Sequence, residues 1–185
     1  MTIKDEVLYA GSIGKEFIKN GKIANHDNNW VKTVDRVGGI HHVDWKVIFD
    51  KLREATGTSF PGYLVHEAVG WSEQMRKWVF LPRRMSTEAY DEKADELKGA
   101  NLALIVDEDF SAVKKVTVGP QVPSHGFSSF KFIPFRENEV LALKSEENGS
   151  SIKSYMTVFD VLTGEILMEE TEVSSNTKFE GIEFL

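Results

Sequence analysis

The chain has 185 residues, of which 22 are basic and 29 acidic, and its formal net charge of −7 argues against a nucleic-acid backbone as the main partner. A hydrophobic content of 41% is enough for one substantial core, and the absence of cysteine excludes disulfides, zinc–thiolate sites and thiol nucleophiles. No apolar run reaches the length of a membrane span and the N-terminus lacks a signal-peptide pattern, so this chain predicts no membrane contact and no targeting signal.

The first predicted strand, Glu6–Ile13, leads into GSIGKE at Gly11–Glu16, where a glycine turn followed by lysine resembles a phosphate loop. The glycines are too close together, Glu16 stands where a magnesium-binding Ser or Thr is needed, and no helical pattern follows. We therefore reject a phosphate loop. Lys15 stays a weak candidate for an anion contact, although a solvent-facing lysine at a strand end is the simpler interpretation.

One helix stands out in the N-terminal third. Before it, the alternation of apolar and polar residues over Trp30–Val37 predicts a half-buried strand. The histidines at 41–42 are interpreted as a loop pair, because adjacent strand side chains point to opposite faces and share a metal with difficulty. Asp44 is the predicted cap of the helix Trp45–Ala55, whose apolar residues return at helical spacing before Gly57 ends it.

A hairpin is predicted over Gly62–Arg84, with two apolar strands joined by a polar turn. Its unusual feature is one acid, Glu67, inside the apolar run of the first strand. Arg83 and Arg84 follow where the second strand is expected to end, in a basic loop. An acid in a half-buried strand with two bidentate anion binders nearby would suit a metal and a phosphate. The plainer alternative is a cross-strand pair of Glu67 with Lys77.

Strands dominate the remainder of the chain. The charged loop Met85–Gly99 has room for a short helix, and its acids at 91–96 offer ion pairs to the nearby arginines. The turn residues and apolar runs then predict seven further strands, at Ala100–Val106, Lys114–Gly119, 128–133, 139–145, 151–160, 165–170 and Lys178–Leu185.

The spacing of these strands predicts an all-β fold with one short helix. Antiparallel meanders of four strands recur at intervals of about fifty to sixty residues, as in the blades of a β-propeller. The first strand of each blade lines the central channel. Glu67, Ser128 and Glu180 lie on three successive first strands, so they are expected to converge on one axis. Oxygen ligands gathered in this way would suit calcium, which takes six to eight of them.

Several motifs together resemble the soluble calcium-activated nucleotidase family of apyrases. They are GYLVHE, WVFLPRR, EKADELKGANL, PSHGFSSFKFIP, ALKSEE and FEGIEFL, in consistent order over nearly the whole chain. The resemblance implies a five-bladed propeller with a calcium ion in its channel, which hydrolyses nucleoside di- and triphosphates such as UDP and GDP. The resemblance also implies a location: either the lumen of the endoplasmic reticulum or Golgi, or secretion from the cell. In the lumen, removal of UDP supports proteoglycan synthesis.

The resemblance assigns residues as well. Calcium is assigned to Glu67, to Ser128 through its hydroxyl or its carbonyl, and to Glu180. Arg83 is the preferred phosphate contact, with Arg84 beside it and Lys15 as a weaker candidate. The implied reaction is metal-assisted phosphoanhydride hydrolysis, in which basic side chains stabilise charge on the phosphoryl group. No general base is assigned, since a strand histidine beside a site is more often a packing or hydrogen-bonding residue.

Members of that family are about twice this length, so residues 1–185 are expected to form about three of five blades. The family's next upstream ligand would lie just before Met1. Two other functions remain open. One is a non-catalytic partial propeller that acts as an interaction module, whose open edges would allow a homodimer. The other is a glycoside hydrolase, for which Trp71 and Trp78 would stack on sugars, although both suit a hairpin core equally well.

Overall fold

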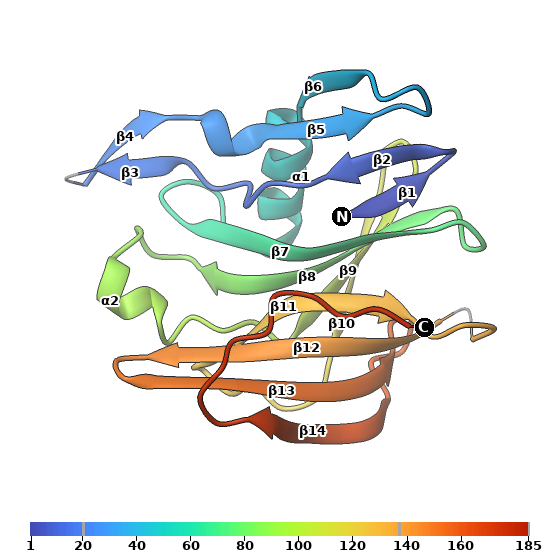
Figure 1. The fold of residues 1–185 in the computed structure, drawn as a ribbon. Helices are drawn as coiled ribbons and strands as arrows, with labels where there is room; N and C mark the ends of the chain where they lie inside the picture. Colours follow the sequence, from blue (N-terminus) through green and yellow to red (C-terminus); the bar gives the residue numbers. More distant parts are fainter. Residues whose placement is uncertain (20, 137, 185) are drawn as a thin grey trace.

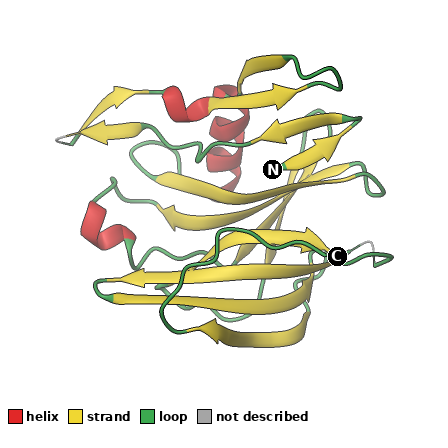
Figure 2. Ribbon diagram, viewed as in Figure 1, coloured by secondary structure: helices red, strands yellow, loops and turns green. Residues whose placement is uncertain are grey.

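The computed structural model describes residues 1–19, 21–136 and 138–184. Its strands form three four-stranded antiparallel sheets and one separate two-stranded hairpin. Figure 1 shows the three sheets stacked in chain order, from the blue first sheet to the orange third. Strands dominate and the longest helix has 11 residues (Figure 2), so the predicted all-β fold with one short helix is confirmed. The recurrent meanders are present, while their closure into a propeller stays a prediction.

The first sheet has the strand order β1-β2-β5-β6. Between β2 and β5 the chain makes the separate β3–β4 hairpin and a short 3-10 helix. The strands of this region are β1 (Thr2–Lys4), β2 (Val7–Ala10), β3 (Phe17–Lys19), β4 (Lys22–Asn25), β5 (Trp30–Val34) and β6 (Ile40–Asp44). The prediction of a loop for the histidines at 41–42 is wrong, because both lie in β6 and bond across the ladder to β5.

The helix α1 (Lys46–Thr56) follows the first sheet closely. Asp44 accepts a hydrogen bond from the Lys46 backbone N–H at 2.8 Å, which satisfies one of the free N–H groups at the helix start. Gly57 ends the helix in the left-handed conformation, with φ of 73°. The predicted helix and its end at Gly57 are therefore confirmed, while the cap position falls on Trp45 and not on Asp44, because the helix begins one residue later than predicted.

The second sheet contains the predicted hairpin, and its strand order is β10-β9-β8-β7. Trp71 and Trp78 lie directly opposite each other on the hairpin, with ring centroids 5.2 Å apart, so they belong to its core. The proposed Glu67–Lys77 pair is wrong, since Lys77 binds Asp107 on β9. The elements of this region are β7 (Tyr63–Ser72), β8 (Lys77–Ser86), α2 (Glu92–Asp95), β9 (Leu102–Asp107) and β10 (Val113–Thr117).

The third sheet is a simple meander in the order β11-β12-β13-β14. Its strands are β11 (His125–Phe132), β12 (Glu139–Asn148), β13 (Ser151–Asp160) and β14 (Ile166–Ser174). The predicted final strand Lys178–Leu185 is wrong for residues 178–184, and residue 185 lies outside the described part. This tail is held instead by hydrogen bonds of Phe179 with the hydroxyls of Ser128 and Ser154.

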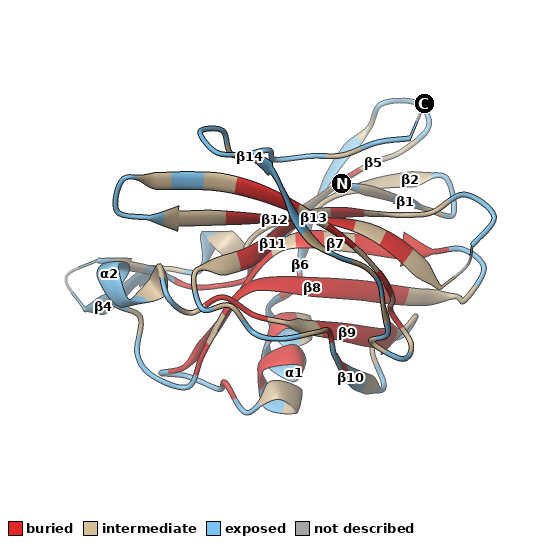
Figure 3. Ribbon diagram, turned by 90° about the horizontal axis from the view of Figure 1, so that it is seen from below, coloured by how far each residue is buried: buried red, intermediate tan, exposed pale blue. Residues whose placement is uncertain are grey.

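Two hydrophobic clusters cover the two faces of the second sheet. One lies against the third sheet and includes Val79 and Phe127, and the other lies against α1 and the first sheet and includes Trp78. Figure 3 shows the buried residues following β8 and β9 through the middle of the molecule. The second sheet is thus the centre of the fold, because it is packed on both sides.

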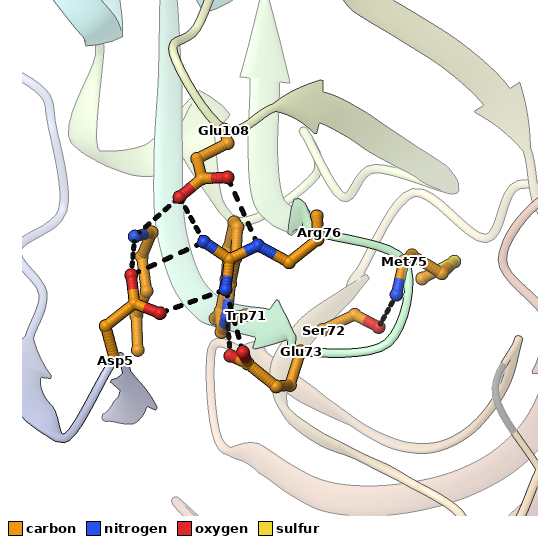
Figure 4. Close-up of polar contacts among 8 residues, drawn as sticks. Asp5, Trp71, Ser72, Glu73, Met75, Arg76 and Glu108 are labelled. Carbon is orange, nitrogen blue, oxygen red and sulfur yellow. Dashed lines mark hydrogen bonds and ion pairs between the residues drawn. The ribbon is translucent and has the colours of Figure 1, made fainter.

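Charged side chains also join the first sheet to the second at one end of the stack. Arg76, in the β7–β8 turn, pairs with Asp5, Glu73 and Glu108, which come from three different turns (Figure 4). The Arg76 guanidinium also lies 4.9 Å from the ring of Trp71. This network connects the first sheet to the second through the Asp5–Arg76 pair. In the described part of the chain, no helix is long and apolar enough to cross a membrane.

Candidate metal and phosphate site

Two of the predicted calcium ligands lie at β-bulges. On β7, His66 pairs with Pro82 and Ala68 with Leu81, which leaves Glu67 as the extra residue. Proline has no N–H for the ladder, so a bulge opposite Pro82 has a direct physical cause. Ser128 occupies the same position on β11, between two paired neighbours. Bulges re-aim side chains and are common beside active sites, so the two first strands share a device that suits a ligand position.

These bulges meet at one cavity. The first strands of the three sheets are neighbours, since β11 lies beside β7 and the Trp71 N–H on β7 donates to Thr2 on β1 at 2.9 Å. A cavity of about 330 Å³ lies between them, and Glu67, Ser128 and Glu180 all line it. Glu180 comes from the tail, which the Ser128 hydroxyl anchors by donating to the Phe179 carbonyl at 3.1 Å. The structure therefore brings the three predicted ligands together.

Acids outnumber bases around Glu67. Arg83 donates to Glu67 at 3.1 Å and to Glu147 at 2.5 Å, while Lys178 lies 2.9 Å from Glu180 and 3.4 Å from Glu147. Burial raises the pKa of Glu67, and the opposing charges of Arg83 and Lys178 do not cancel this effect. Three carboxylates thus share two cations. The half-buried Glu67 would gain from one more positive charge, which a cation in the cavity supplies.

The two arginines lie in β8 and not in a basic loop after it, so the predicted placement is wrong. Both are almost fully buried, with 4% of Arg83 and 3% of Arg84 exposed. Adjacent strand residues point to opposite faces, and the pair therefore separates. Arg83 binds Glu67, while Arg84 donates to the Ser124 carbonyl at 3.3 Å and lies 3.8 Å from Asp95. The predicted pairing with the acidic residues at 91–96 is found for Arg84 alone.

Lys15 does not face solvent, and it does not line the cavity of Glu67. Only 7% of the residue is exposed, and its ammonium lies 3.7 Å from the centre of the Tyr90 ring. It donates to the backbone carbonyl of Glu16 at 3.1 Å and lines a second, smaller cavity with Tyr63 and Phe60. Burial lowers the pKa of Lys15, because an apolar surrounding disfavours its charge.

The two histidines beside predicted ligands have the modest roles expected of them. His125 lies between two carboxylates, with Nε2 at 3.2 Å from Glu146 and Nδ1 in contact with Glu170. His66 packs against the rings of Phe49 and Phe80. Burial lowers the pKa of His66 to about 3, so its imidazole is neutral at physiological pH.

Sequence reasoning missed the residues that hold Arg83. Ser145 and Glu147 both bind its guanidinium from β12, where they are two residues apart on one face. That alternation was readable from the sequence, but nothing local showed which face met β8. Lys178, the bridge between Glu147 and Glu180, was likewise read only as the start of a strand.

The fold and the site together define a class: an all-β protein of repeated four-stranded sheets, with oxygen donors gathered where the first strands of the sheets meet. A comparison with protein families agrees with this class. The apyrase family matches residues 1–185, and the chain belongs to that family.

Curated relatives extend over the whole chain. It is 45% identical over 187 residues to the soluble calcium-activated nucleotidase 1 of Rattus norvegicus, covering 100% of this chain and 46% of the relative. It is 41% identical to apyrase apy-1 of Caenorhabditis elegans, covering 100% of this chain and 53% of the relative. With the apyrase of Cimex lectularius the identity is 39%, covering 96% and 49%. The chain thus spans about half the length of the curated relatives it matches.

Proposed function

We propose that this chain is part of a calcium-dependent nucleotidase that hydrolyses nucleoside diphosphates such as UDP and GDP, and also triphosphates. The observation that carries the proposal is the convergence of Glu67, Ser128 and Glu180 on one cavity, two of them at equivalent bulges. The names of the rat, nematode and insect relatives, a calcium-activated nucleotidase and two apyrases, support a nucleotidase activity. We also propose that the protein acts in the secretory pathway or outside the cell, as the family resemblance implies.

The residues present suit calcium. All three residues offer oxygens and two of them are carboxylates, the kind of ligand that calcium takes. Burial raises the pKa of Glu67, so a cation beside it would favour its charged form. Among the described residues, no three His, Cys, Asp or Glu side chains form a complete metal cluster. Calcium takes six to eight oxygens at flexible geometry, so serine, backbone and water oxygens would supply the others. When bound, the ion would neutralise phosphate charge and polarise the phosphoryl group.

Arg83 is the proposed phosphate contact beside this site. Its guanidinium already spans Glu67 and Glu147, at 3.1 and 2.5 Å, so it is held beside Glu67, which lines the cavity. Planar arginine binds phosphate oxygens in pairs and stabilises the charge that develops on them. Arg84 and Lys15 are proposed to act at a greater distance through their positive charges, which the nearby Asp95 partly offsets.

The larger architecture belongs to the same proposal. Three sheets with adjacent first strands suit about three blades of a five-bladed propeller, and the open outer faces suit pairing of two copies. Exposed apolar residues on the first and third sheets, such as Ile40 and Leu167, support such pairing. Sedimentation of the chain in calcium tests it: a mass of two chains is expected, and a monomer at high concentration would refute the dimer.

A pair of glutamine variants tests the calcium site. Glu67→Gln should weaken calcium binding, measured by titration calorimetry, by more than about tenfold, because it removes the one charged donor at the β7 bulge. Glu172→Gln is the control, since this exposed acid on β14 pairs with Lys153 away from the cavity. Calcium affinity and phosphate release that are the same in Glu67→Gln and in the unmodified chain would refute the assignment.

A further inference from the structure

The turn between β12 and β13 carries a short motif that the proposed metal and phosphate site does not use. Asn148, Gly149 and Ser150 form the pattern Asn-X-Ser, in which X is not proline. Among the asparagines of the sequence, only Asn148 is followed by a serine or threonine at the second position. This pattern accepts an asparagine-linked oligosaccharide when it is exposed on a chain that enters the secretory lumen.

The structure places this acceptor motif at the tip of a hairpin. β12 and β13 pair without a break up to Asn148 and Ser151, which leaves Gly149 and Ser150 as a two-residue turn. Gly149 has φ of 58°, the left-handed conformation that glycine favours at the first position of such a turn. All three residues of the motif are exposed, and Figure 1 shows the turn at the left end of the third sheet. The fold therefore leaves the motif accessible to a modifying enzyme.

A backbone contact holds the turn against the rest of the fold. The Gly149 N–H donates to the carboxylate of Glu96, at the C-terminal end of α2, at 3.0 Å. Because the donor is a backbone group, this bond does not occupy the amide of Asn148 or the hydroxyl of Ser150. Those are the two side-chain groups that the acceptor motif requires.

An oligosaccharide on Asn148 would lie away from the proposed metal and phosphate site. Residues 148–150 do not line the cavity of Glu67. Glu147, the neighbour of Asn148 on β12, binds Arg83, and β12 keeps a regular register with β13 at this point. Adjacent residues on a regular strand point to opposite faces, so the Asn148 side chain is directed away from Arg83. The hairpin can thus carry a bulky group without disturbing that contact.

We propose that Asn148 is a site of asparagine-linked glycosylation. In the reaction, the amide nitrogen of Asn148 attacks the anomeric carbon of an oligosaccharide carried on a lipid pyrophosphate. A C–N bond forms, the C–O bond to the pyrophosphate breaks, and the lipid pyrophosphate leaves while the amide gives up one proton. The inference rests on the part of the proposed function that places the protein in the secretory pathway. It goes beyond that function by assigning a covalent modification to one residue.

Translation in the presence of microsomes tests the acceptor motif directly. The full chain, fused behind a cleavable signal peptide, is translated with these membranes, and protection from added protease identifies the molecules that have entered. Entered chains should be heavier by one oligosaccharide, and peptide N-glycosidase should remove the added mass. Asn148→Gln and Ser150→Ala should each abolish the added mass, whereas Ser150→Thr should keep it. Asn176→Gln is the control, because this exposed asparagine lies outside the motif.

Mass spectrometry of a tryptic peptide assigns the modified residue. Trypsin cleaves after Lys144 and Lys153, and Asn148 is the one asparagine in the peptide between them. This peptide should carry the oligosaccharide in chains that entered the microsomes. Entered chains whose peptide is unmodified, or an added mass that persists in Asn148→Gln, would overturn the proposal.

Phosphate release separates this inference from the proposed nucleotidase. Because the turn lies outside the cavity of Glu67, Asn148→Gln should release phosphate from UDP in calcium at the same rate as the glycosylated chain. A glycosylated chain that hydrolyses no nucleotide would support the modification and count against the nucleotidase. A chain that enters the microsomes and hydrolyses UDP, but has no oligosaccharide on Asn148, would refute the modification and support the nucleotidase.

Discussion

Arg53→Met should lower the free energy of unfolding by about 3–5 kcal/mol, because it leaves a buried carboxylate without its partner. Arg53, on α1, donates two parallel hydrogen bonds to Glu16, each of 2.7 Å. The side chains are 4% and 9% exposed, so water screens this pair little. In a domain of this size, the loss corresponds to a fall of roughly 6–20 °C in the unfolding midpoint. Urea unfolding, followed by tryptophan fluorescence, measures the change in the free energy of unfolding.

The double variant with Glu16→Leu and Arg53→Met is the control. Removing both charges removes the unpaired group as well, so the double variant should be more stable than Arg53→Met alone. The reasoning is refuted if Arg53→Met stays within about 1 kcal/mol of the unmodified chain, which is the range of an exposed pair. A double variant less stable than Arg53→Met would contradict it too.

Two further predictions concern the third sheet. Burial alone would raise the pKa of Glu170, but its contacts with His125 and Lys144 together outweigh burial and hold the pKa below its usual value. The stabilisation from Glu170 is present above the pKa that it has in the unfolded chain, and it is lost as the pH falls through its pKa in the folded chain. Glu170→Gln should therefore flatten the acid side of a plot of melting temperature against pH. An unchanged slope would contradict this prediction. Gly126→Ala should be strongly destabilising, because its Cβ would lie 2.3 Å from the Arg83 carbonyl; Gly181→Ala, where a Cβ meets open space, is the control, and equal melting temperatures would refute the clash.

Much of the strand pattern could be predicted from sequence, because alternation and turn residues are local signals. The strand predicted at 151–160 matches β13 (Ser151–Asp160), and the hairpin and helix also lie where expected. The tail failed for a physical reason. A strand needs a neighbouring strand to bond, and the tail is held at Phe179 by two serine hydroxyls and at Lys178 by an ion pair with Glu147.

The candidate site was half predictable. Regular spacing of first strands was enough to bring Glu67 and Ser128 together, whereas Glu180 reaches the cavity from a tail that is not a strand. The only sequence signal for the bulges at these positions was Pro82. The burial of the basic residues was not predictable. Arg83 finds Glu147 at a sequence separation of 64 residues, which no local pattern can show.

Phosphate release by the purified chain is the most direct test of the central claim. UDP and GDP are offered in calcium and again in excess EGTA, with Glu67→Gln beside the unmodified chain. The account predicts release in calcium, none in EGTA, and none from Glu67→Gln in either condition. Release that continues in EGTA, or that Glu67→Gln retains in full, would contradict a calcium site built on Glu67.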